Sequence, residues 1–252
     1  MTVDYGGLRA LDDVDLTVRS GSITGLIGPN GAGKTTLFDC VSGIVRPSSG
    51  LIELFGRDVT NWPLHQRARL GLGRTFQRLE LFASLTVEEN VIVALESRSS
   101  VGGLASEVFR RPASLDVRRR AEGRAAELLD LVGLTEHART RTADLPMGLA
   151  RVLEIARALA TEPKLLLLDE PSSGLNDQET AELASLLSTI HAQRRLSMLI
   201  VEHDMEFVLG LSDHVYVLEF GRMLADGAPD EVRSDARVRA AYLGEETAGA
   251  GR

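Results

Sequence analysis

Apolar side chains alternate with polar ones in the first part of the chain, which is the spacing of β-strands. The alternation runs largely through Leu11, Val14, Leu16 and Val18. A mostly apolar stretch at 22–27 predicts a buried strand, which leads through a glycine-rich segment into a predicted helix at 35–42. Turn-forming residues at 47–50 precede a further short strand, predicted at 51–55.

The pattern changes to that of helices over residues 76–157 and then returns to strands alternating with helices. Helices are predicted at 86–95 and 118–134, with a Ser/Gly-rich and then basic insertion at 98–116. Apolar strands that alternate with helices indicate an α/β fold with a parallel sheet covered on both faces. The strands predicted after residue 157 are 164–168, 197–201 and 215–219, and the helices are 177–193 and 205–211. Residues 245–252 are predicted to be a disordered tail.

Composition narrows the class of protein. With 44% apolar and 25% charged residues the chain has the profile of a globular domain, and its net charge of -8 argues against broad nucleic-acid binding. Apolar runs such as 165–168 and 198–201 are far shorter than the roughly 18 residues that a membrane helix needs. The N-terminal residues show no signal-peptide pattern. Work at a membrane would therefore require a partner. The single cysteine, Cys40, is interpreted as a small buried apolar residue.

The strongest motif is Gly28–Thr35, which matches G-x-x-x-x-G-K-[ST] between a predicted strand and a predicted helix. This is the context of a P-loop, the phosphate-binding loop of many nucleotide-binding proteins. Its glycines let the backbone curl closely around an anion, and the amides of the curl and of the helix N-terminus hold negative charge. Lys34 supplies a positive charge for the β- and γ-phosphates. The Thr35 hydroxyl suits Mg²⁺, which prefers oxygen ligands.

Two adjacent carboxylates end a second buried strand. Asp169 and Glu170 follow the four leucines at 165–168, at the edge where ligands bind in open α/β sheets. Asp169 suits Mg²⁺, and Glu170 is placed to polarise a water for attack on a γ-phosphate. Many strands end in Asp, so the pattern becomes specific only together with the P-loop. Kinases and GTPases share both elements, and further motifs decide between these classes.

The further motifs, taken in order, resemble those of the ABC transporter ATPase family. Gln77, within 73–77, lies where that family has its Q-loop glutamine, and 145–159 lies where its signature helix begins. Residues 173–176 look like the D-loop and His203 like the switch histidine. Tyr5 lies where an aromatic residue stacks on adenine. The resemblance extends from Tyr5 to about residue 243, which is nearly the whole chain.

This resemblance implies a fold, cofactors and site residues. The fold is a P-loop NTPase core with a parallel sheet, an N-terminal antiparallel β subdomain and an inserted α-helical signature subdomain. In one domain over 1–244, the RecA-like core takes about 1–75 and 158–244 and the helical subdomain about 76–157. The cofactors are ATP and Mg²⁺, with Glu170 and His203 catalytic and Thr35, Gln77 and Asp169 as metal ligands. The residues implied for nucleotide binding are Tyr5, Gly28, Pro29, Asn30, Gly31, Ala32, Gly33, Lys34, Thr35, Thr36 and Gln77.

Within the family, several segments look like the importers of branched-chain amino acids. This branch implies an ATP-hydrolysing subunit on the cytoplasmic face of the plasma membrane, held there by integral membrane permease subunits and served indirectly by a substrate-binding protein. No nucleic-acid partner is implied. The solute is chosen by the partners, so the ATPase of a lipid or lipopolysaccharide exporter is the alternative. The segments that carry the resemblance are 5–8, 10–11, 73–77, 174–176, 201–205 and 238–244.

One motif departs from the family pattern. The usual signature is Leu-Ser-Gly-Gly-Gln and reaches across a dimer to the other subunit's ATP, whereas this chain has Leu145, Pro146, Met147, Gly148 and Leu149. Pro146 offers neither a hydroxyl nor an N–H, but proline is tolerated in the first turn, so the helix is expected to form. We therefore expect a heterodimer with a second ABC ATPase subunit. The alternatives are a homodimer and a weakly hydrolysing regulatory cassette in a heterodimer.

Overall fold

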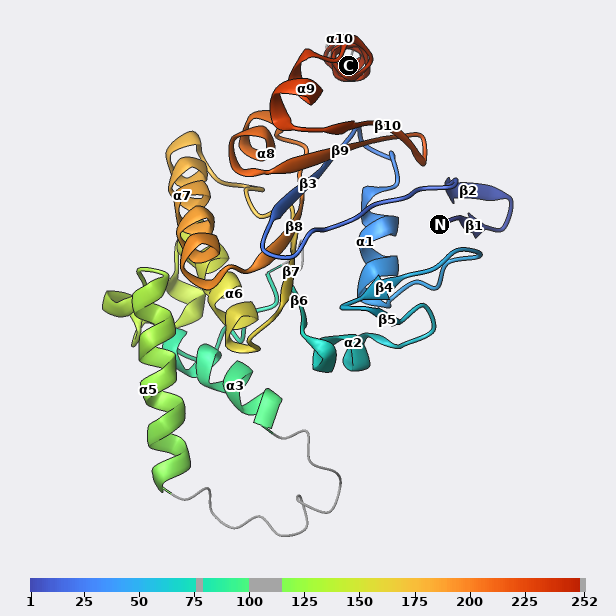
Figure 1. The fold of residues 1–252 in the computed structure, drawn as a ribbon. Helices are drawn as coiled ribbons and strands as arrows, with labels where there is room; N and C mark the ends of the chain where they lie inside the picture. The colour runs from blue at the N-terminus through green and yellow to red at the C-terminus, as the bar shows by residue number, and fades with distance from the viewer. Residues whose placement is uncertain (76–78, 100–114, 250–252) are drawn as a thin grey trace.

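The computed structural model describes residues 1–75, 79–99 and 115–249, and its centre is a six-stranded sheet in the order β10-β9-β3-β8-β7-β6 (Figure 1). Neighbouring strands are parallel except for β10, which is antiparallel to β9. The predicted parallel sheet is therefore confirmed, with one antiparallel edge strand. The strands are β3 (Ile23–Ile27), β6 (Leu72–Arg74), β7 (Leu165–Asp169), β8 (Ser197–Val201), β9 (His214–Glu219) and β10 (Arg222–Gly227).

Two antiparallel hairpins lie beside this sheet, as expected for the N-terminal β subdomain. They pair β1 (Val3–Tyr5) with β2 (Leu8–Leu11), and β4 (Glu53–Leu54) with β5 (Arg57–Asp58). A bridge between Thr2 and Ser49 links the first hairpin to the turn before the second. The alternation predicted from Leu11 onward does not continue as a regular strand beyond β2.

The central strands bury apolar side chains on both faces. In β7, Leu166 and Leu168 belong to one buried cluster, and Leu165 and Leu167 belong to the other. Helices α7 and α8 lie on the first face and α1 on the second (Figure 1). The run of four leucines reflects this two-sided burial, because a strand with one solvent-exposed face would alternate with polar residues. The helices of the α/β core are α1 (Lys34–Ser42), α7 (Asp177–Arg194), α8 (Met205–Leu211), α9 (Pro229–Ser234) and α10 (Ala236–Gly249), with α2 (Leu64–Leu70) before β6.

The region between β6 and β7 is mainly helical where the structure describes it, and its helices pack on one another. Helix α3 (Val87–Ser99) lies against both α5 (Leu115–Leu131) and α6 (Met147–Ala160), with short 3₁₀ turns at Thr135–His137 and Thr142–Asp144. Buried Val91, Leu129 and Leu153 join the three helices in one apolar cluster. The insertion predicted at 98–116 is helical at both ends, since α3 runs to residue 99 and α5 starts at 115. The rest of it lies outside the described residues.

The C-terminal segment differs from the sequence-based expectation. A disordered tail is predicted from residue 245, whereas α10 continues to Gly249. Glu245, Glu246 and Ala248 are good helix formers, so a helix that has already begun at Ala236 can propagate through them. Residues 250–252 lie outside the described residues. Within the described part of the chain, no helix combines the length and apolar character needed to cross a membrane.

Candidate functional site

Four segments that are far apart in the sequence meet at the carboxyl edge of the sheet. The P-loop follows β3, His203 follows β8, Glu170 follows β7, and Thr75 follows β6. These strands are neighbours in the order β3-β8-β7-β6 and are parallel, so their carboxyl ends lie side by side (Figure 1). This edge is where open α/β sheets bind ligands. The fold therefore brings the P-loop together with the segments that carry Glu170 and His203, the two catalytic residues predicted from the sequence.

The P-loop is packed closely against the rest of the protein at Gly28 and Gly33 and is open at Gly31, which lies between them. A Cβ atom at Gly28 would lie 2.1 Å from the Leu218 carbonyl oxygen, and one at Gly33 would lie 2.8 Å from the Ala10 carbonyl oxygen. Both glycines have positive φ, 154° and 104°. At Gly31, by contrast, a Cβ atom would meet nothing within 4 Å. The loop is thus fixed on its protein side and exposed on the side that a phosphate would approach.

The start of α1 suits an anion. Its N-cap residue is Gly33, which provides no side-chain cap, and the first turn contains no acidic residue. The uncapped N–H groups and the helix dipole favour negative charge there. Lys34 is buried, and its Nζ donates to the carbonyl oxygens of Gly28 at 2.5 Å and Pro29 at 3.0 Å. The ammonium group therefore lies against the carbonyl oxygens of the loop itself.

An arginine that the sequence analysis did not single out holds the end of β7. Arg74 donates to Asp39 at 2.7 Å, to the Ser42 hydroxyl at 2.6 Å and to Asp169 at 3.1 Å. Its guanidinium also lies over the Phe38 ring, 5.3 Å from the centroid. Burial raises the pKa of the Asp169 carboxyl, and the positive charge of Arg74 opposes part of that rise. The sequence placed Arg74 only within the segment 73–77 that carries the Q-loop resemblance, and the strand that it ends was not predicted.

The donors at this edge fit Mg²⁺ held partly by phosphate oxygens. Thr35 offers an exposed hydroxyl in the first turn of α1, and Asp169 offers a carboxylate at the end of β7. Over the described residues, no three His, Cys, Asp or Glu side chains gather as a metal-binding group. Mg²⁺ commonly uses one or two protein oxygens together with phosphate oxygens and water. Gln77, the third predicted metal ligand, lies outside the described residues.

The two predicted catalytic residues lie on adjacent loops. Glu170 is half-buried and has φ of 46°, a left-handed conformation that costs a non-glycine residue about 1 kcal/mol. Its N–H donates to the Val201 carbonyl oxygen at 2.9 Å, which ties the turn after β7 to β8. The His203 side chain is 60% exposed. The two residues thus follow neighbouring strands of the sheet, β7 and β8.

The altered signature forms the start of α6. Pro146 is the N-cap, with extended backbone (φ -56°, ψ 153°), and its carbonyl oxygen accepts from the Ala150 N–H at 3.0 Å. The expectation that a helix forms despite this proline is confirmed. Met147 is 50% exposed, while Leu145 and Leu149 pack against the core. Gly148 lies close to α7, because a Cβ atom there would be 2.8 Å from the Glu179 carboxylate.

Tyr5 lies on the hairpin next to the P-loop. It is the last residue of β1 and is 46% exposed. The partner strand β2 carries Ala10 and Leu11, which approach Gly33 of the P-loop. The hairpin thus places an exposed aromatic side chain on the subdomain that contacts the P-loop.

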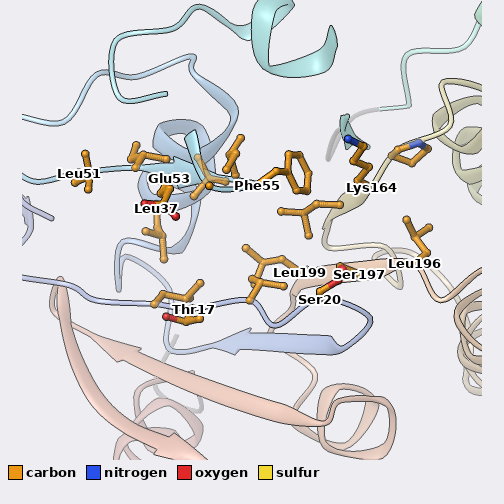
Figure 2. A pocket seen from close by; sticks show the side chains of 18 of the residues that line it. Thr17, Ser20, Leu37, Leu51, Glu53, Phe55, Lys164, Leu196, Ser197 and Leu199 are labelled. Atoms are coloured by element: carbon orange, nitrogen blue, oxygen red, sulfur yellow. The ribbon is translucent and has the colours of Figure 1, made fainter. Parts of the chain in front are cut away.

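A large cavity lies away from these residues. Its volume is about 1190 Å³, and it is bounded by the segment before β3, by the β4 region and by the starts of β7 and β8. Figure 2 shows Thr17, Leu51 and Leu196 among the side chains around it. At one end Lys164 lies over the Phe55 ring, 5.4 Å from the centroid. Apolar and charged side chains both line the cavity, which lies toward the amino ends of β7 and β8 and is separate from the phosphate-binding edge.

These features define a class of protein: a P-loop nucleoside triphosphatase with an inserted helical block. A family model described as ABC transporter matches residues 11–173. A second, described as branched-chain amino acid ATP-binding cassette transporter, matches residues 222–248. The chain belongs to the ABC transporter ATP-binding family. It is therefore a nucleotide-binding subunit that hydrolyses ATP in a transport system, as the sequence analysis predicted.

Individual relatives agree with this assignment. The high-affinity branched-chain amino acid transport ATP-binding protein LivG of Salmonella typhimurium is 44% identical over 241 residues, 96% of this chain and 94% of LivG. The protein BraF of Pseudomonas aeruginosa, with the same description, is 42% identical over 245 residues, 97% of this chain and 96% of BraF. The structure of the ADP conformation of MJ1267, an ATP-binding cassette of an ABC transporter, matches with a TM-score of 0.82, 28% identity and 96% coverage of both chains.

Proposed function

We propose that this chain powers an importer of branched-chain or related amino acids, at the cytoplasmic face of a membrane and attached to permease subunits. Support for this solute class comes from LivG and BraF, which are described as branched-chain amino acid transport proteins and match nearly the whole chain. The supporting observation within the structure is the meeting of the P-loop, Glu170 and His203 at one sheet edge. The ATPase of a lipid or lipopolysaccharide exporter is the rival.

In the proposed chemistry, the P-loop amides and Lys34 hold the β- and γ-phosphates of ATP. Thr35 and Asp169 hold the Mg²⁺ that neutralises their charge, with Gln77 as a further ligand. Glu170 accepts a proton from the attacking water, and His203 donates to the γ-phosphate. Tyr5 stacks on the adenine ring. The metal would neutralise charge on the phosphates. The protein groups bind and orient the nucleotide, and Glu170 accepts the proton.

We further propose that two cassettes close around ATP and that the partner is a different ATPase subunit. Gly31, Thr35 and the His203 side chain are exposed in the single chain, so a second protein surface has access to the site. The signature of this chain would face the partner's ATP with Pro146 and Met147, which lack the serine hydroxyl and add bulk. The partner's own signature would complete the site of this chain. A regulatory cassette with little hydrolysis is the rival within this assembly.

The test is the ATPase rate of the purified chain as a function of its concentration, with Glu170→Gln as the blank. A Glu170-dependent rate that rises faster than linearly would show working homodimers and overturn the need for a second kind of subunit. ATP binding without a rate above the blank would support the heterodimer, and adding the partner ATPase should then restore hydrolysis. Absence of ATP binding itself would contradict the proposed P-loop chemistry.

A further inference from the structure

A buried carboxylate next to His203 has no part in the chemistry described so far. Glu202 follows β8 and is 0% exposed, between the P-loop strand β3 and the strand β7. Its backbone N–H donates to the Leu26 carbonyl oxygen at 3.3 Å, which fixes the residue at the carboxyl edge of the sheet. A carboxylate is rarely fully buried unless its oxygens are satisfied by donors. The donors around Glu202 therefore indicate what holds it there.

One oxygen of Glu202 binds the turn after β7. Oε1 accepts from the Ser172 N–H at 2.7 Å and from the Ser172 hydroxyl at 2.6 Å. Ser172 is two residues after Glu170, and the N–H of Ser173 donates to the Glu170 carbonyl oxygen at 3.1 Å. Hydrogen bonds to a charged acceptor, as in these two, are stronger than those between neutral groups. This oxygen therefore restrains the turn that carries Glu170.

The other oxygen lies against His203. Oε2 accepts from the His203 N–H at 3.3 Å and lies 3.6 Å from its Nδ1. The first contact holds the backbone of His203, and the second places the carboxylate beside its largely exposed imidazole. Burial raises the pKa of the Glu202 carboxyl, and the Ser172 and His203 contacts oppose the rise. The residue thus occupies a costly position in which each oxygen serves a different loop.

We propose that Glu202 is a positioning residue that fixes His203 relative to Glu170 across the β7–β8 edge. Its side chain is fully buried, and it acts through the two loops that it joins. The inference rests on the proposed roles of Glu170 and His203. Loops that carry catalytic groups must hold them within a fraction of an ångström of the productive geometry, so a direct link between the two loops preserves their spacing.

The variant Glu202→Gln separates the two halves of this link. Its amide oxygen accepts both bonds from Ser172, but its NH₂ group, now facing His203, cannot accept from the His203 N–H. We expect kcat for ATP hydrolysis to fall about tenfold, at the lower end of what loss of an orienting partner costs a metal-bound histidine. The KM for ATP should change less than about twofold, because the P-loop is untouched. The matched control is Glu206→Gln, the same chemical change on an exposed carboxylate in α8.

Nuclear magnetic resonance of the imidazole distinguishes positioning from a merely structural role. The His203 signals, assigned by their absence in His203→Ala, should shift in Glu202→Gln and stay in place in Glu206→Gln. Ser172→Ala, which removes only the hydroxyl donor, should give a smaller loss of kcat than Glu202→Gln. In the His203→Ala background, Glu202→Gln should cause no further loss.

Wild-type kcat and unshifted His203 signals in Glu202→Gln would overturn the inference. A lower kcat accompanied by unshifted His203 signals and a lower unfolding free energy would overturn it too, because it would reduce Glu202 to a stabilising residue. If His203→Ala itself hydrolyses ATP at the wild-type rate, the proposed role of His203 fails instead. The signal shift in Glu202→Gln then decides by itself whether the two loops are linked.

Discussion

Two glycines of the P-loop, Gly28 at a fixed position of the motif and Gly31 at a variable one, have different surroundings. Gly28, at φ 154°, faces the Leu218 carbonyl oxygen of β9, and a side chain there would collide with backbone. Gly31, at φ 80°, faces open space. Both need a conformation that L residues rarely adopt, but only Gly28 also needs the missing volume. Gly28 is therefore needed for packing as well as for backbone shape, and Gly31 for backbone shape alone.

The replacement Gly28→Ala should therefore lower the free energy of unfolding by more than about 2 kcal/mol, since a backbone oxygen cannot move away as a flexible side chain can. Gly31→Ala should cost only about 1 kcal/mol, the strain of a positive φ. Urea unfolding of both variants without nucleotide measures the difference. Equal losses would show that the contact with Leu218 does not limit this position.

The environment of Cys40 supports its interpretation as a small buried apolar residue. Cys40 lies in α1, is fully buried, and burial raises the pKa of its thiol to about 11. Only about one thiol in a thousand is then ionised at pH 8. We expect native protein to react with iodoacetamide on the order of 100-fold more slowly than urea-unfolded protein. Mass spectrometry measures the extent of labelling over time. Equal labelling rates in the two states would show that burial does not protect the Cys40 thiol.

At the N-terminus of α6 the helical backbone is kept, although the side chains of the signature are altered. Pro146 caps the helix with extended backbone, so the fold accepts the altered signature. Gly148 keeps the close approach to Glu179, a residue of the capping box that starts α7. In the proposed dimer, the departure therefore concerns the groups that would face the partner's nucleotide: Pro146 lacks a hydroxyl and an N–H, and Met147 adds bulk.

The double replacement Pro146→Ser and Met147→Gly should raise the ATPase rate several-fold wherever this signature limits turnover, since one well-placed donor to a developing charge is worth about 10²-fold. The unfolding free energy should change by no more than about 1 kcal/mol, because serine is a good N-cap while glycine weakens the first turn. Steady-state hydrolysis and urea unfolding measure the two effects. An unchanged rate would mean that the altered signature is not limiting.

The whole molecule presents its nucleotide site on an open edge. The sheet edge carries the P-loop and both catalytic candidates, while the single chain leaves Gly31, Thr35 and His203 exposed. ATP bound there would have protein on one side and solvent on the other. A ligand that is buried only when two cassettes meet shifts the equilibrium toward the closed pair by its differential affinity for the two states.

Glu170→Gln should make this closed pair visible. Removing the general base should slow hydrolysis by about 10²-fold or more while leaving ATP binding intact. With ATP and Mg²⁺, and with the partner subunit if one is required, light scattering should then report a stable dimer of cassettes. Lys34→Ala, which weakens phosphate binding, is the control and should remain monomeric. Turnover at the wild-type rate would remove Glu170 from its proposed role.

The sequence predicted the central strands and several helices of the α/β core and proposed the candidate site residues, but it did not predict β6, β10, α2, α9 or α10. Strand β8 and helix α8 coincide with the predicted ranges 197–201 and 205–211, because apolar periodicity and Asp204 at the N-cap are local signals. The P-loop was likewise evident because its glycines, lysine and threonine are contiguous. The end of α10 was mispredicted because polar, glycine-containing residues indicate disorder when read without the helix that precedes them.

Only the tertiary structure decided which distant side chains meet. Arg74 donates hydrogen bonds to Asp39, which is 35 residues away in the sequence, and to Asp169, which is 95 residues away. Glu202 accepts from Ser172, which is 30 residues away. Strand order sets the pairs Arg74–Asp169 and Glu202–Ser172, because neighbours in the sheet bring their carboxyl ends together whatever their separation along the chain. Asp39 belongs to α1, so its pair with Arg74 depends on the packing of that helix beside the sheet. Periodicity and motifs report the local conformation of the chain, whereas the partners of a buried charge are fixed by packing.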